Sequence, residues 1–467
     1  MQKQNYIHNT GDTIAAISTA AGPGGIGIVR LSGKKAVQIA DKLFISRNKE
    51  KLSAKKTHTV SYGHVKNKGK IVDEVVVTLM RAPRSYTTED IVEINCHGGI
   101  VPLRNVLNLA ISSGARLAAP GEFTKRAFIN GRIDLAQAEA VLDIIKAKTE
   151  SVAQIAQGQL EGELSGEVKS IKEAMIDVLT EIEAQIDFSE EDIEALPKKS
   201  IIKTLEAISK RIKKLIDNAS GGIILKEGVL CVICGRPNAG KSSLMNAFLK
   251  RNRVIVTPMP GTTRDAIEEA VNLKGIPLVV VDTAGIARAK DAAEIEGMQK
   301  SKSYIKKADI ILFMIDLSKK WSKIDENIFN SIKEKPIIVI ANKNDLQRKL
   351  DLKKIKKEKS LNKIIEISLL KKKNIEKCEE AILKTIWRGK TVHSESIFVT
   401  NLRHKKELEH AKNSIKMAQA ALSEETSFPE IVASFLKEGV VSLGAILGDN
   451  LELDILERIF SQFCIGK

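Results

Sequence analysis

The segment VLCVICGRPNAGKSSLMNAFL, residues 229–249, decides the fold of the middle of this chain. Its first residues are apolar and β-branched, as in a buried strand, and its last residues have the apolar spacing of an amphipathic helix. Between them stands the pattern G-x-x-x-x-G-K-S. Its glycines let backbone amides point at phosphate, Lys241 reaches the β and γ oxygens, and Ser242 offers its hydroxyl to Mg²⁺. The segment therefore predicts a P-loop nucleotide site.

Two later strands end in polar residues that complete such a site. The run LVVVDTAG places Asp282 to hold Mg²⁺ through water and Gly285 to give an amide to the γ-phosphate. The run IIVIANKND ends in Asn342, Lys343 and Asp345. The Asp345 carboxylate can accept both the ring N–H and the exocyclic amine of guanine, whereas adenine presents no such donor pair. GTP is therefore favoured over ATP.

The loop VTPMPGTTRD lies between these motifs in the sequence. Thr263 of this loop is expected to complete the Mg²⁺ shell when the loop closes. The residue after Gly285 is Ile286, where a Ras-like GTPase has the glutamine that orients the attacking water. Hydrolysis must therefore position water and neutralise charge in another way.

The whole sequence predicts a multidomain fold of α+β and α/β type. A chain of 467 residues is too long for one core and should form roughly three domains. Short β-branched runs (TIAAIS, GIVRLS, IVDEVVVTLM and DIVEINCHGG) around one helical stretch indicate a compact α+β domain. Apolar residues at three- and four-residue spacing, as in the stripe from Leu164 to Ile182, then indicate long packed helices. Gly221 and Gly222 are expected to break that pattern before strands alternate with helix-length segments. The expected parts are an α+β domain (1–131), a helical domain in two parts (132–221 and 386–467) and, inserted between them, a Ras-like P-loop GTPase domain with a largely parallel sheet (222–385).

Charge and composition narrow the classes of partner. A net charge of +16 favours an anionic partner, nucleic acid first, although the ten lysines between Gln347 and Asn374 are more typical of a solvated face. An aromatic content of 4% argues against base stacking as the main RNA contact. No apolar run approaches the length of a membrane helix, which is roughly 18 residues, and the first residues have no apolar signal core. A cytoplasmic protein without a membrane partner is expected.

Two short patterns imitate other kinds of site. GPGGIG, residues 22–27, satisfies G-x-G-x-x-G, but a dinucleotide site needs a helix to open there and the β-branched IVRLSG follows instead. A glycine turn close to another ligand or to backbone is favoured. CVIC, residues 231–234, lies inside an apolar strand and has no second cysteine pair. These cysteines are expected to be small buried hydrophobes rather than zinc or redox ligands.

Taken together, these motifs carry a resemblance that covers the whole chain. The sequence resembles the tRNA modification GTPase family MnmE, also called TrmE. The motifs that carry the resemblance are GPGGIGIVRLSG, YTTEDIVEINCHGG, PGEFTKRAFINGRIDLAQAEA, GRPNAGKSS, GTTRD, DTAG, NKND and the final FCIGK.

The resemblance implies a substrate and partners. Members of the family form homodimers through the N-terminal domain, which binds a one-carbon donor of the 5-formyl-tetrahydrofolate type. With the FAD-containing partner MnmG (GidA), they modify C5 of the wobble uridine of certain tRNAs to aminomethyl or carboxymethylaminomethyl forms. Arg30, Glu93 and Arg132 fall on folate-contacting positions, although Arg132 is a lysine in some relatives. The sequence leaves open which tRNAs are read and whether glycine or ammonium supplies the nitrogen.

The resemblance also assigns a potassium site and a catalytic residue. Asn238 falls on a position that holds K⁺, together with Thr257, Met259 and Thr262, chiefly through backbone carbonyls. Potassium can supply the positive charge that an arginine finger supplies elsewhere. Glu294 matches the residue that orients the attacking water when two GTPase domains meet. The GTP-contacting residues expected overall are Asn238, Ala239, Gly240, Lys241, Ser242, Ser243, Thr257, Thr262, Thr263, Asp282, Thr283, Ala284, Gly285, Asn342, Lys343 and Asp345.

One motif departs from the family, and one lies at the end of the sequence. The guanine loop, expected as Ser-Ala-Lys or Ser-Ala-Arg, reads SLL at residues 368–370. In the family, the final Cys-x-Gly-Lys folds back toward the folate pocket, so Cys464 is a predicted catalytic thiol. Lys467 is predicted to neutralise the folate. The docking stripe expected for this fold-back is Leu453, Leu456, Ile459, Phe460 and Phe463.

Two other classes of function stay open at this stage. GTPases of ribosome assembly share GTTRD and DTAG, but they carry a KH-type or a second GTPase module, and neither a basic G-x-x-G loop nor a second Walker motif is present in this sequence. A scaffold for MnmG that GTP controls, without chemistry of its own, is the third class. Folate binding separates the enzyme from both alternatives.

Overall fold

A computed structural model describes residues 11–20, 22–187, 197–252, 268–282, 302–353, 355, 363–387, 397–424, 428–449 and 453–467. The chain divides into two compact units. The first unit comprises Met1–Leu142, Gly158–Ile212 and Glu407–Lys467, and the second comprises Asp143–Gln157 and Lys213–Lys406. The finer domain boundaries expected from the sequence stay a prediction.

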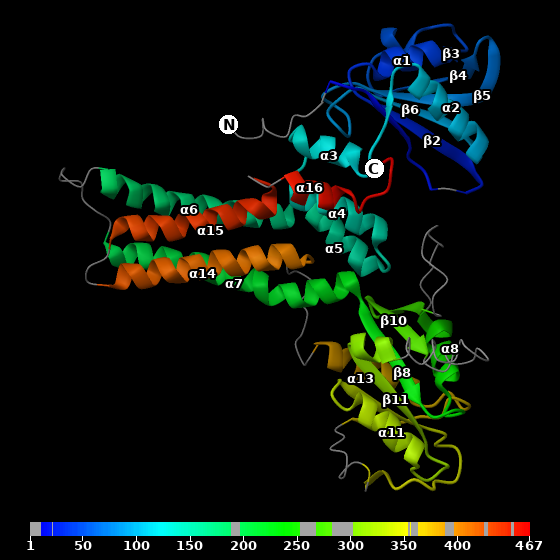
Figure 1. The fold of residues 1–467 in the computed structure, drawn as a ribbon, viewed down its shortest axis with the longest axis vertical. Helices are drawn as coiled ribbons and strands as arrows, with labels where there is room; N and C mark the ends of the chain where they lie inside the picture. The colour runs from blue at the N-terminus through cyan, green and yellow to red at the C-terminus, as the bar shows by residue number, and fades with distance from the viewer. Residues whose placement is uncertain are drawn as a thin grey trace. The chain divides into compact units, whose positions relative to one another are not determined.

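The first unit contains a seven-stranded sheet, drawn in blue in Figure 1. Its strand order is β3-β4-β5-β6-β2-β1-β7, and the pairs are antiparallel except for β1 with β7. The β-branched runs that predicted strands form β1, β2, β5 and β6, so those predictions are confirmed. The bounds are β1 Ile14–Ile17, β2 Gly24–Ser32, β3 Phe44–Ser46, β4 Thr59–Asn67, β5 Lys70–Met80, β6 Ile91–Gly98 and β7 Arg116–Leu117.

Three helices and a short 3₁₀ segment accompany this sheet. Helices α1 and α2 bury apolar residues at three- and four-residue spacing against one face of the sheet, in a core that includes Val29, Leu31 and Ile94. Helix α3 follows the last strand and carries Phe123, which is fully buried. The bounds are α1 Ala36–Leu43, η2 Leu52–Ala54, α2 Ile100–Ser112 and α3 Glu122–Ile129.

The residues 22–27 that imitate a dinucleotide motif do not open a helix. From Gly24 they belong to β2, which pairs with β6. A dinucleotide site of the Rossmann kind is therefore excluded at this position, as the β-branched continuation predicts.

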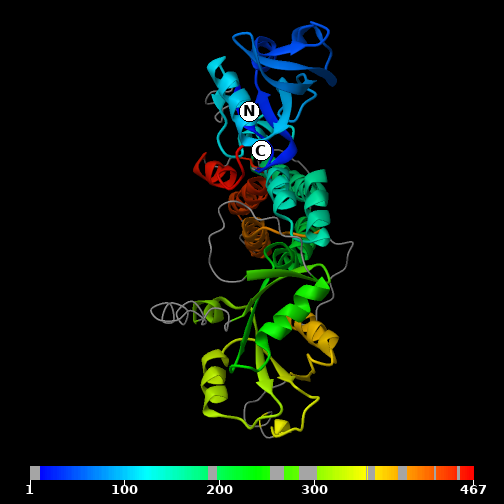
Figure 2. The same cartoon turned by 90° about the vertical axis from the view of Figure 1, so that its right-hand side faces the viewer.

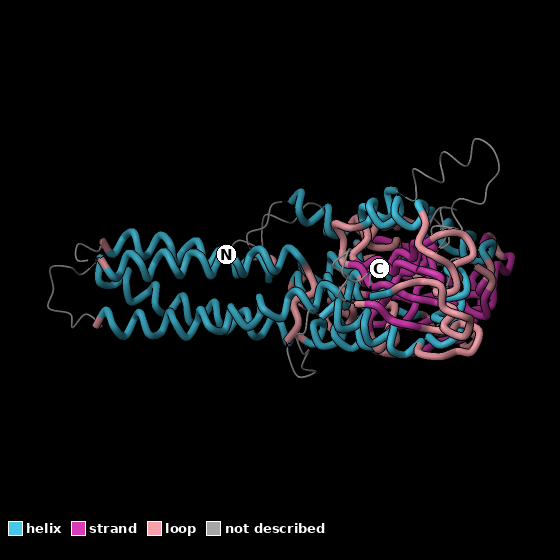
Figure 3. Tube along the Cα trace, turned by 90° about the horizontal axis from the view of Figure 1, so that it is seen from below, coloured by secondary structure: helices cyan, strands magenta, loops and turns pink. Residues whose placement is uncertain are grey.

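Long helices make up the rest of the first unit. Helices α6 and α15 run side by side in Figure 1, and Figure 3 shows the long helices from below. The apolar stripe expected on the first of them, from Leu164 to Ile182, is buried throughout, which confirms that prediction. The helices wholly within this unit are α6 Glu163–Asp187, α15 Pro429–Leu447 and α16 Leu453–Phe460. Four further helices have residues in both units: α4 Leu135–Lys146, α5 Glu150–Glu161, α7 Lys198–Glu227 and α14 Leu402–Ser423.

The expected helix break at Gly221 and Gly222 is wrong. Helix α7 continues through both glycines to Glu227. A side chain at Gly222 would place its Cβ 2.5 Å from the carbonyl oxygen of Val399. Glycine is needed at this position because another part of the chain approaches closely. This requirement outweighs the stability cost of glycine within a helix, which is about 1 kcal/mol.

The second unit is a six-stranded sheet with helices on both faces, seen in Figure 2. Its order is β13-β12-β11-β8-β10-β9, and only β9 is antiparallel to its neighbour. The predicted parallel strands at β8, β10, β11 and β12 are confirmed, whereas β9 and β13 were not foreseen. The bounds are β8 Val229–Gly235, β9 Glu268–Leu273, β10 Ile276–Asp282, β11 Ile310–Asp316, β12 Ile337–Asn342, β13 Ile364–Glu366, α8 Lys241–Asn252, α11 Lys323–Ile332 and α13 Ile375–Trp387.

The side chains of strand β8 contribute to two hydrophobic cores, one on each face of the sheet. Cys231 and Ile233 face the core with α8 and α13, while Val232 and Cys234 face the core with α11. All four side chains are buried, because successive residues of a strand point to opposite faces and both faces are covered. The prediction that these cysteines are buried hydrophobes is confirmed, and burial raises the pKa of the Cys231 thiol.

Two kinds of feature are absent from the described residues. No group of histidine, cysteine, aspartate or glutamate side chains in the described ranges has the arrangement of a metal site. None of the helices in those ranges combines the length and the apolar character needed to cross a bilayer.

Candidate functional site

The loop between β8 and α8 borders a cavity of about 1070 Å³ in the second unit. Gly235 ends the strand and Lys241 begins the helix, so the strand-loop-helix arrangement that the sequence predicts is present. Residues from the ends of β8 and β12 share the wall, because the carboxyl ends of parallel strands lie at one edge of a sheet. The lining residues are Gly235, Pro237, Asn238, Gly240, Lys241, Ser242, Ser243, Asn342, Lys343, Asp345, Leu346, Leu369 and Leu370.

The phosphate end of this cavity contains a lysine and a pair of oxygen donors. The Lys241 ammonium donates to the carbonyl oxygens of Gly235 at 2.8 Å and Arg236 at 3.0 Å. The Ser242 hydroxyl donates to the Asp282 carboxylate at 2.6 Å, and Asp282 is buried. A hydroxyl and a carboxylate in contact are hard oxygen ligands of the kind that Mg²⁺ prefers. The geometry thus fits the predicted roles of these residues.

Asn342 connects the two ends of the cavity. Its side-chain amide donates to the carbonyl oxygen of Ala239 in the P-loop at 2.9 Å. Its amide oxygen accepts from the backbone N–H of Leu369 at 3.3 Å. Since Asn342 is buried, these bonds fix the P-loop relative to the loop that would face guanine.

The base end is arranged around Asp345. The Ser368 hydroxyl donates to one carboxylate oxygen at 2.5 Å, and this bond lowers the pKa of Asp345. The carboxylate is therefore ionised and ready to accept two N–H groups of guanine. The serine of SLL thus orients Asp345, while Leu369 and Leu370 line the wall where the resemblance predicts Ala-Lys or Ala-Arg. Leu370 is 84% exposed and forms an apolar rim.

Lys343 is held by Asp316, a residue that belongs to none of the sequence motifs. Its ammonium lies 2.7 Å from Asp316, the last residue of β11. Asp316 is buried and its other oxygen accepts from the backbone N–H and hydroxyl of Ser318. Burial alone would raise the pKa of Asp316, but these bonds and Lys343 lower it. The only signal in the sequence is the position of this carboxylate at the end of an apolar strand.

Several predicted site residues lie outside the described ranges. They are Thr257, Met259, Thr262, Thr263, Thr283, Ala284, Gly285 and Glu294, and Ile286 lies outside as well. Within the described residues, Asn238 and Ser243 line the cavity, and Asn238 has a left-handed backbone with φ of 63°.

A second site forms in the first unit around Arg30. Arg30 and Glu93 are direct partners of β2 and β6, and their side chains form an ion pair at 2.7 Å. The Arg30 guanidinium lies over the ring of Phe123, 5.6 Å from its centre. A guanidinium, a carboxylate and aromatic rings can bind a flat heterocycle that has both donors and acceptors. The motif GEFTKRAF contained Phe123, but no role was assigned to it from the sequence.

The last residues of the chain reach this site. The backbone N–H of Gly121 donates to the carbonyl oxygen of Cys464 at 3.3 Å, and that of Phe123 donates to Lys467 at 3.2 Å. Arg30 donates to the carbonyl oxygen of Gly466 at 3.4 Å. The Cys464 thiol belongs to an exposed residue. The structure therefore brings residues 464–467, called the tail below, beside Arg30.

Aromatic packing and one glycine account for the position of the tail. Leu456, Phe460 and Phe463 are buried in a cluster with Phe128 of α3, whereas Leu453, expected in the same stripe, is 45% exposed. Ile459 packs on the cluster from its edge. At Gly466, φ is 94° and a Cβ would lie 2.3 Å from the carbonyl oxygen of Ile17, so only glycine fits there.

Arg132 lies on a different aromatic ring. Its guanidinium stacks over Tyr86 at 4.8 Å from the ring centre and donates to the Tyr86 carbonyl oxygen at 3.3 Å. Tyr86 packs against the small core that contains Phe123, and its hydroxyl is bonded to that of Thr124. Arg30 and Arg132 thus stand on two aromatic side chains that belong to the same cluster. Tyr86 comes from YTTED, a motif whose residues were given no role from the sequence.

Two family models match this sequence, one at its N-terminal region and one over the remainder. Residues 13–132 match the model described as "GTP-binding protein TrmE N-terminus". Residues 135–464 match the model described as "MnmE helical domain".

Curated relatives match the chain over nearly its full length. A protein of Alkaliphilus oremlandii is 46% identical over 98% of this chain and 99% of its own length. One from Clostridioides difficile is 46% identical with the same coverage, and one from Bacillus subtilis is 43% identical over 98% of this chain and 100% of its own. Each is named "tRNA modification GTPase MnmE". A crystal structure of Aquifex aeolicus Era bound to GDP.AlF4- is 31% identical over 41% of this chain and 67% of its own, with a TM-score of 0.28.

Proposed function

This chain belongs to the MnmE family of tRNA modification GTPases, and we propose that it hydrolyses GTP in a potassium-dependent reaction that serves one-carbon modification of tRNA. With an FAD-containing partner of the MnmG type, it takes a one-carbon unit from a tetrahydrofolate and modifies C5 of the wobble uridine. The products are aminomethyl or carboxymethylaminomethyl forms of that uridine. A tRNA substrate favours the cytoplasm as its location.

The proposal rests on one observation: the chain has two separate sites lined by buried or paired polar side chains. One is the cavity in which Asn342 joins the P-loop to the guanine loop. The other is the Arg30 site, which the tail completes. A GTPase switch that only binds RNA has no use for the second site. The two sites together favour an enzyme over the ribosome-assembly switch and over the scaffold.

GTP hydrolysis in the cavity follows from the chain's own groups. The P-loop amides and Lys241 bind the phosphates, and Asp345 and Lys343 bind guanine. Ser242 and Thr263 are the proposed holders of Mg²⁺, with Asp282 behind Ser242 at 2.6 Å. Bound Mg²⁺ neutralises phosphate charge.

We propose that K⁺ binds beside the P-loop, next to Asn238. Asn238 lines the cavity, as a ligand near the phosphates must. Thr257, Met259 and Thr262 are the other proposed holders, and Glu294 is proposed to orient water. Bound K⁺ supplies the positive charge that other GTPases take from an arginine finger.

The Arg30 site supplies the features that a folate requires. Glu93 accepts hydrogen bonds from a pterin edge, Arg30 and Arg132 donate, and Phe123 and Tyr86 present aromatic rings. Lys467 is proposed to attract the anionic part of the folate. The exposed Cys464 lies at the same place and is proposed as the thiol that attacks the uridine ring or captures an intermediate.

A homodimer is proposed through the sheet of the first unit. The side chains of Ile26, Val60, Tyr62 and Val76 are exposed on this sheet. They line a hollow of about 460 Å³. Apolar side chains gathered on an open sheet face are typical of an interface, and the resemblance to homodimeric relatives makes a second copy of this chain the proposed occupant.

Reconstitution tests the proposal. The full-length protein, a partner of the MnmG type, tRNA, GTP and 5-formyl-tetrahydrofolate are combined in K⁺ or in Na⁺, and the tRNA nucleosides are analysed. We expect modified wobble uridine only when all components are present, and GTP turnover at least about tenfold faster in K⁺. The Cys464→Ser protein should hydrolyse GTP and bind folate normally but form no modified nucleoside.

Each measurement in this experiment can contradict one part of the proposed function. Equal turnover in K⁺ and Na⁺ removes the potassium role. Failure of the full-length protein to bind the folate removes the one-carbon role and favours the switch or the scaffold. Full modification by Cys464→Ser shows that the thiol takes no part in the chemistry.

A further inference from the structure

Arg126 is a buried arginine on the helix that receives the tail. It lies in α3, three residues after Phe123, and its side chain is 5% exposed. Neither the GTP cavity nor the contacts of Arg30 make use of it. Two of its carboxylate partners, Glu122 and Glu89, come from GEFTKRAF and YTTED, motifs whose charged residues have no role in the proposed chemistry, and the third is Asp12.

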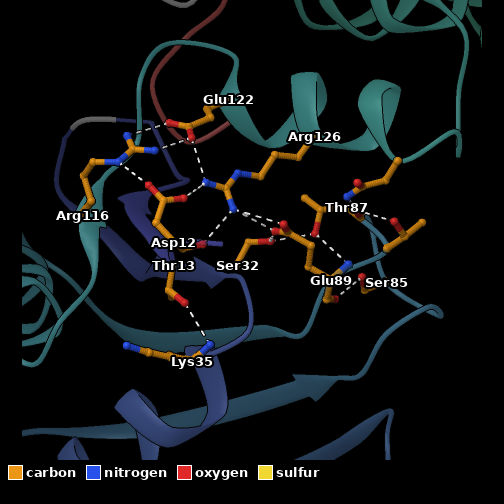
Figure 4. Close-up of polar contacts among 12 residues, drawn as sticks. Asp12, Thr13, Ser32, Lys35, Ser85, Thr87, Glu89, Arg116, Glu122 and Arg126 are labelled. Atoms are coloured by element: carbon orange, nitrogen blue, oxygen red, sulfur yellow. Dashed lines mark hydrogen bonds and ion pairs between the residues drawn. The ribbon is translucent and has the colours of Figure 1, made fainter. Parts of the chain in front are cut away.

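The guanidinium of Arg126 is surrounded by three carboxylates, as Figure 4 shows. Its Nη2 donates to Asp12 at 2.6 Å and to Glu122 at 2.9 Å. Its Nη1 donates to Glu89 at 3.1 Å and to the carbonyl oxygen of Asp12 at 3.1 Å. Arg126 thus joins α3 to the segment before β1 and to the loop before β6.

A second arginine stands on the outer side of this cluster. Arg116 contacts Asp12 at 2.8 Å and Glu122 at 2.7 Å. Burial opposes charge on Glu122, but the hydrogen bonds from both arginines lower its pKa. Among the ion pairs of the described residues, Glu89 is paired with Arg126 alone. Glu89 therefore depends on Arg126 for its counter-charge.

The cluster is connected to the strand that carries Arg30. The hydroxyl of Ser32 donates to Glu89 at 2.7 Å. Ser32 lies two residues after Arg30 on β2, so the two side chains share one face of the sheet. The chain of contacts from α3 through Arg126 and Glu89 to Ser32 sets the distance between α3 and that face.

The same helix supports both halves of the Arg30 site. The Phe123 ring lies under Arg30, and the N–H groups of Gly121 and Phe123 hold the backbone of the tail. Helix α3 has no side-chain cap hydrogen bond at its first turn. Buried Phe123 and Phe128 anchor it in the core, and Arg126 adds the ionic contacts to the segments beside it. A displacement of about 1 Å is enough to lose a large part of a site's activity.

We propose that Arg126 is a positioning residue for the one-carbon site, because it holds α3 where Phe123 supports Arg30 and where the tail can dock. The identity of the ligand as a folate rests on the proposed function. The placement of the tail does not.

The test compares Arg126→Lys with Arg81→Lys in the full-length protein. Lysine keeps the charge but loses the planar fork that contacts several oxygens at once. Arg81 is the matched control, because it too contacts several oxygens in the same unit, the backbone oxygens of Leu52, Ser53 and Lys55. Its ion pair is with Asp90, and it makes no contact with α3 or Glu89 among those of the described residues. Hydrogen exchange is measured for peptides covering residues 119–124 and 460–467, together with the Kd for 5-formyl-tetrahydrofolate.

For Arg126→Lys we expect exchange in those two peptides to rise at least about tenfold and the Kd to rise about tenfold. Exchange in β4 and β5 and the GTP turnover should change less than about twofold. Arg81→Lys should leave the α3 and tail peptides and the Kd unchanged. Glu89→Gln, which keeps the shape and an acceptor for Ser32, should show the pattern of Arg126→Lys with smaller amplitude, and it serves if Arg126→Lys does not fold.

Unchanged exchange in both peptides overturns the proposal. A rise of equal size in every strand of the sheet also overturns it, because it shows a general stabilising role. If the unmodified protein does not bind the folate but the tail peptide still loses protection in Arg126→Lys, the proposed function is wrong and the positioning role stands.

Discussion

The GTP cavity and the Arg30 site are assembled from the chain in opposite ways. Gly235, Asp282 and Asn342 each end one of the parallel strands of the same sheet, so the shared direction of these strands brings them to one edge. Arg30 and Gly466 are 436 residues apart in the chain and meet only because α16 packs beside α3. The first site is made by topology and the second by tertiary packing.

The two sites also differ in the interactions that stabilise them. The tail is held by the burial of Leu456, Phe460 and Phe463, each of which contributes roughly 1.5–3 kcal/mol. Its polar contacts are single hydrogen bonds of 3.2–3.4 Å to backbone atoms. The P-loop is held instead by strands on both sides and by the buried Asn342. The tail site should therefore be lost more easily than the GTP cavity when the chain is perturbed.

The largest expected effect separates the two sites chemically. Lys241→Ala removes the cation at the P-loop and should lower GTP turnover at least about 100-fold. The Kd for 5-formyl-tetrahydrofolate should stay within about twofold, because the Arg30 site uses none of the P-loop residues. Turnover and binding are measured on the same preparation. Lys250→Ala, at an exposed position on the same helix, is the control and should match the unmodified protein.

A change in folate affinity of the same size as the loss of turnover would contradict the independence of the two sites. It would require that the nucleotide cavity contributes to the structure of the Arg30 site.

The second effect tests the tail alone. Gly466→Ala places a Cβ 2.3 Å from the carbonyl oxygen of Ile17 in a backbone of positive φ, so the tail must leave its place. We expect formation of modified wobble uridine to fall at least about tenfold, with GTP turnover unchanged. Gly166→Ala in α6 is the control, since no atom lies within 4 Å of its Cβ position. It should be neutral or stabilise the protein by about 0.5–1 kcal/mol. Normal modification by Gly466→Ala would show that the docked tail is not the working one.

The smallest effect is a dependence of stability on pH around α3. The pKa values of Asp12 and Glu122 are lowered in the folded protein, because bonds from Arg116 and Arg126 outweigh the effect of burial. Their contribution to stability is complete above their unfolded pKa values of about 4 and is lost as the pH falls through the lower folded values. Hydrogen exchange in β1 and α3 should therefore accelerate as the pH falls below about 4, after correction for the intrinsic rate.

Glu122→Gln should weaken this acid dependence. His97 acts with the opposite sign, because the bond to Asp73 raises its pKa, so its contribution is present below about pH 6.5 and is lost as the pH rises through the folded value. If the exchange rates of Glu122→Gln depend on acid pH as strongly as those of the unmodified protein, groups other than Glu122 are responsible.

The sequence alone predicted what depends on local pattern. The P-loop, Asp282, Asn342 and Asp345 follow apolar strands in a fixed spacing, and such strands in alternation with helices form a parallel sheet. The stripe from Leu164 to Ile182 is buried because its period matches that of a helix.

Only the tertiary structure decided which distant side chains meet. Ser368 on Asp345, Asp316 on Lys343 and Phe123 under Arg30 are contacts between different elements, and no spacing in the sequence encodes them. Helix α7 runs through Gly221 and Gly222 although local propensity predicts a break, because packing against other parts of the chain outweighs a cost of about 1 kcal/mol per glycine. Pattern along the chain determines elements, whereas the free energy of burial between elements determines the Arg30 site.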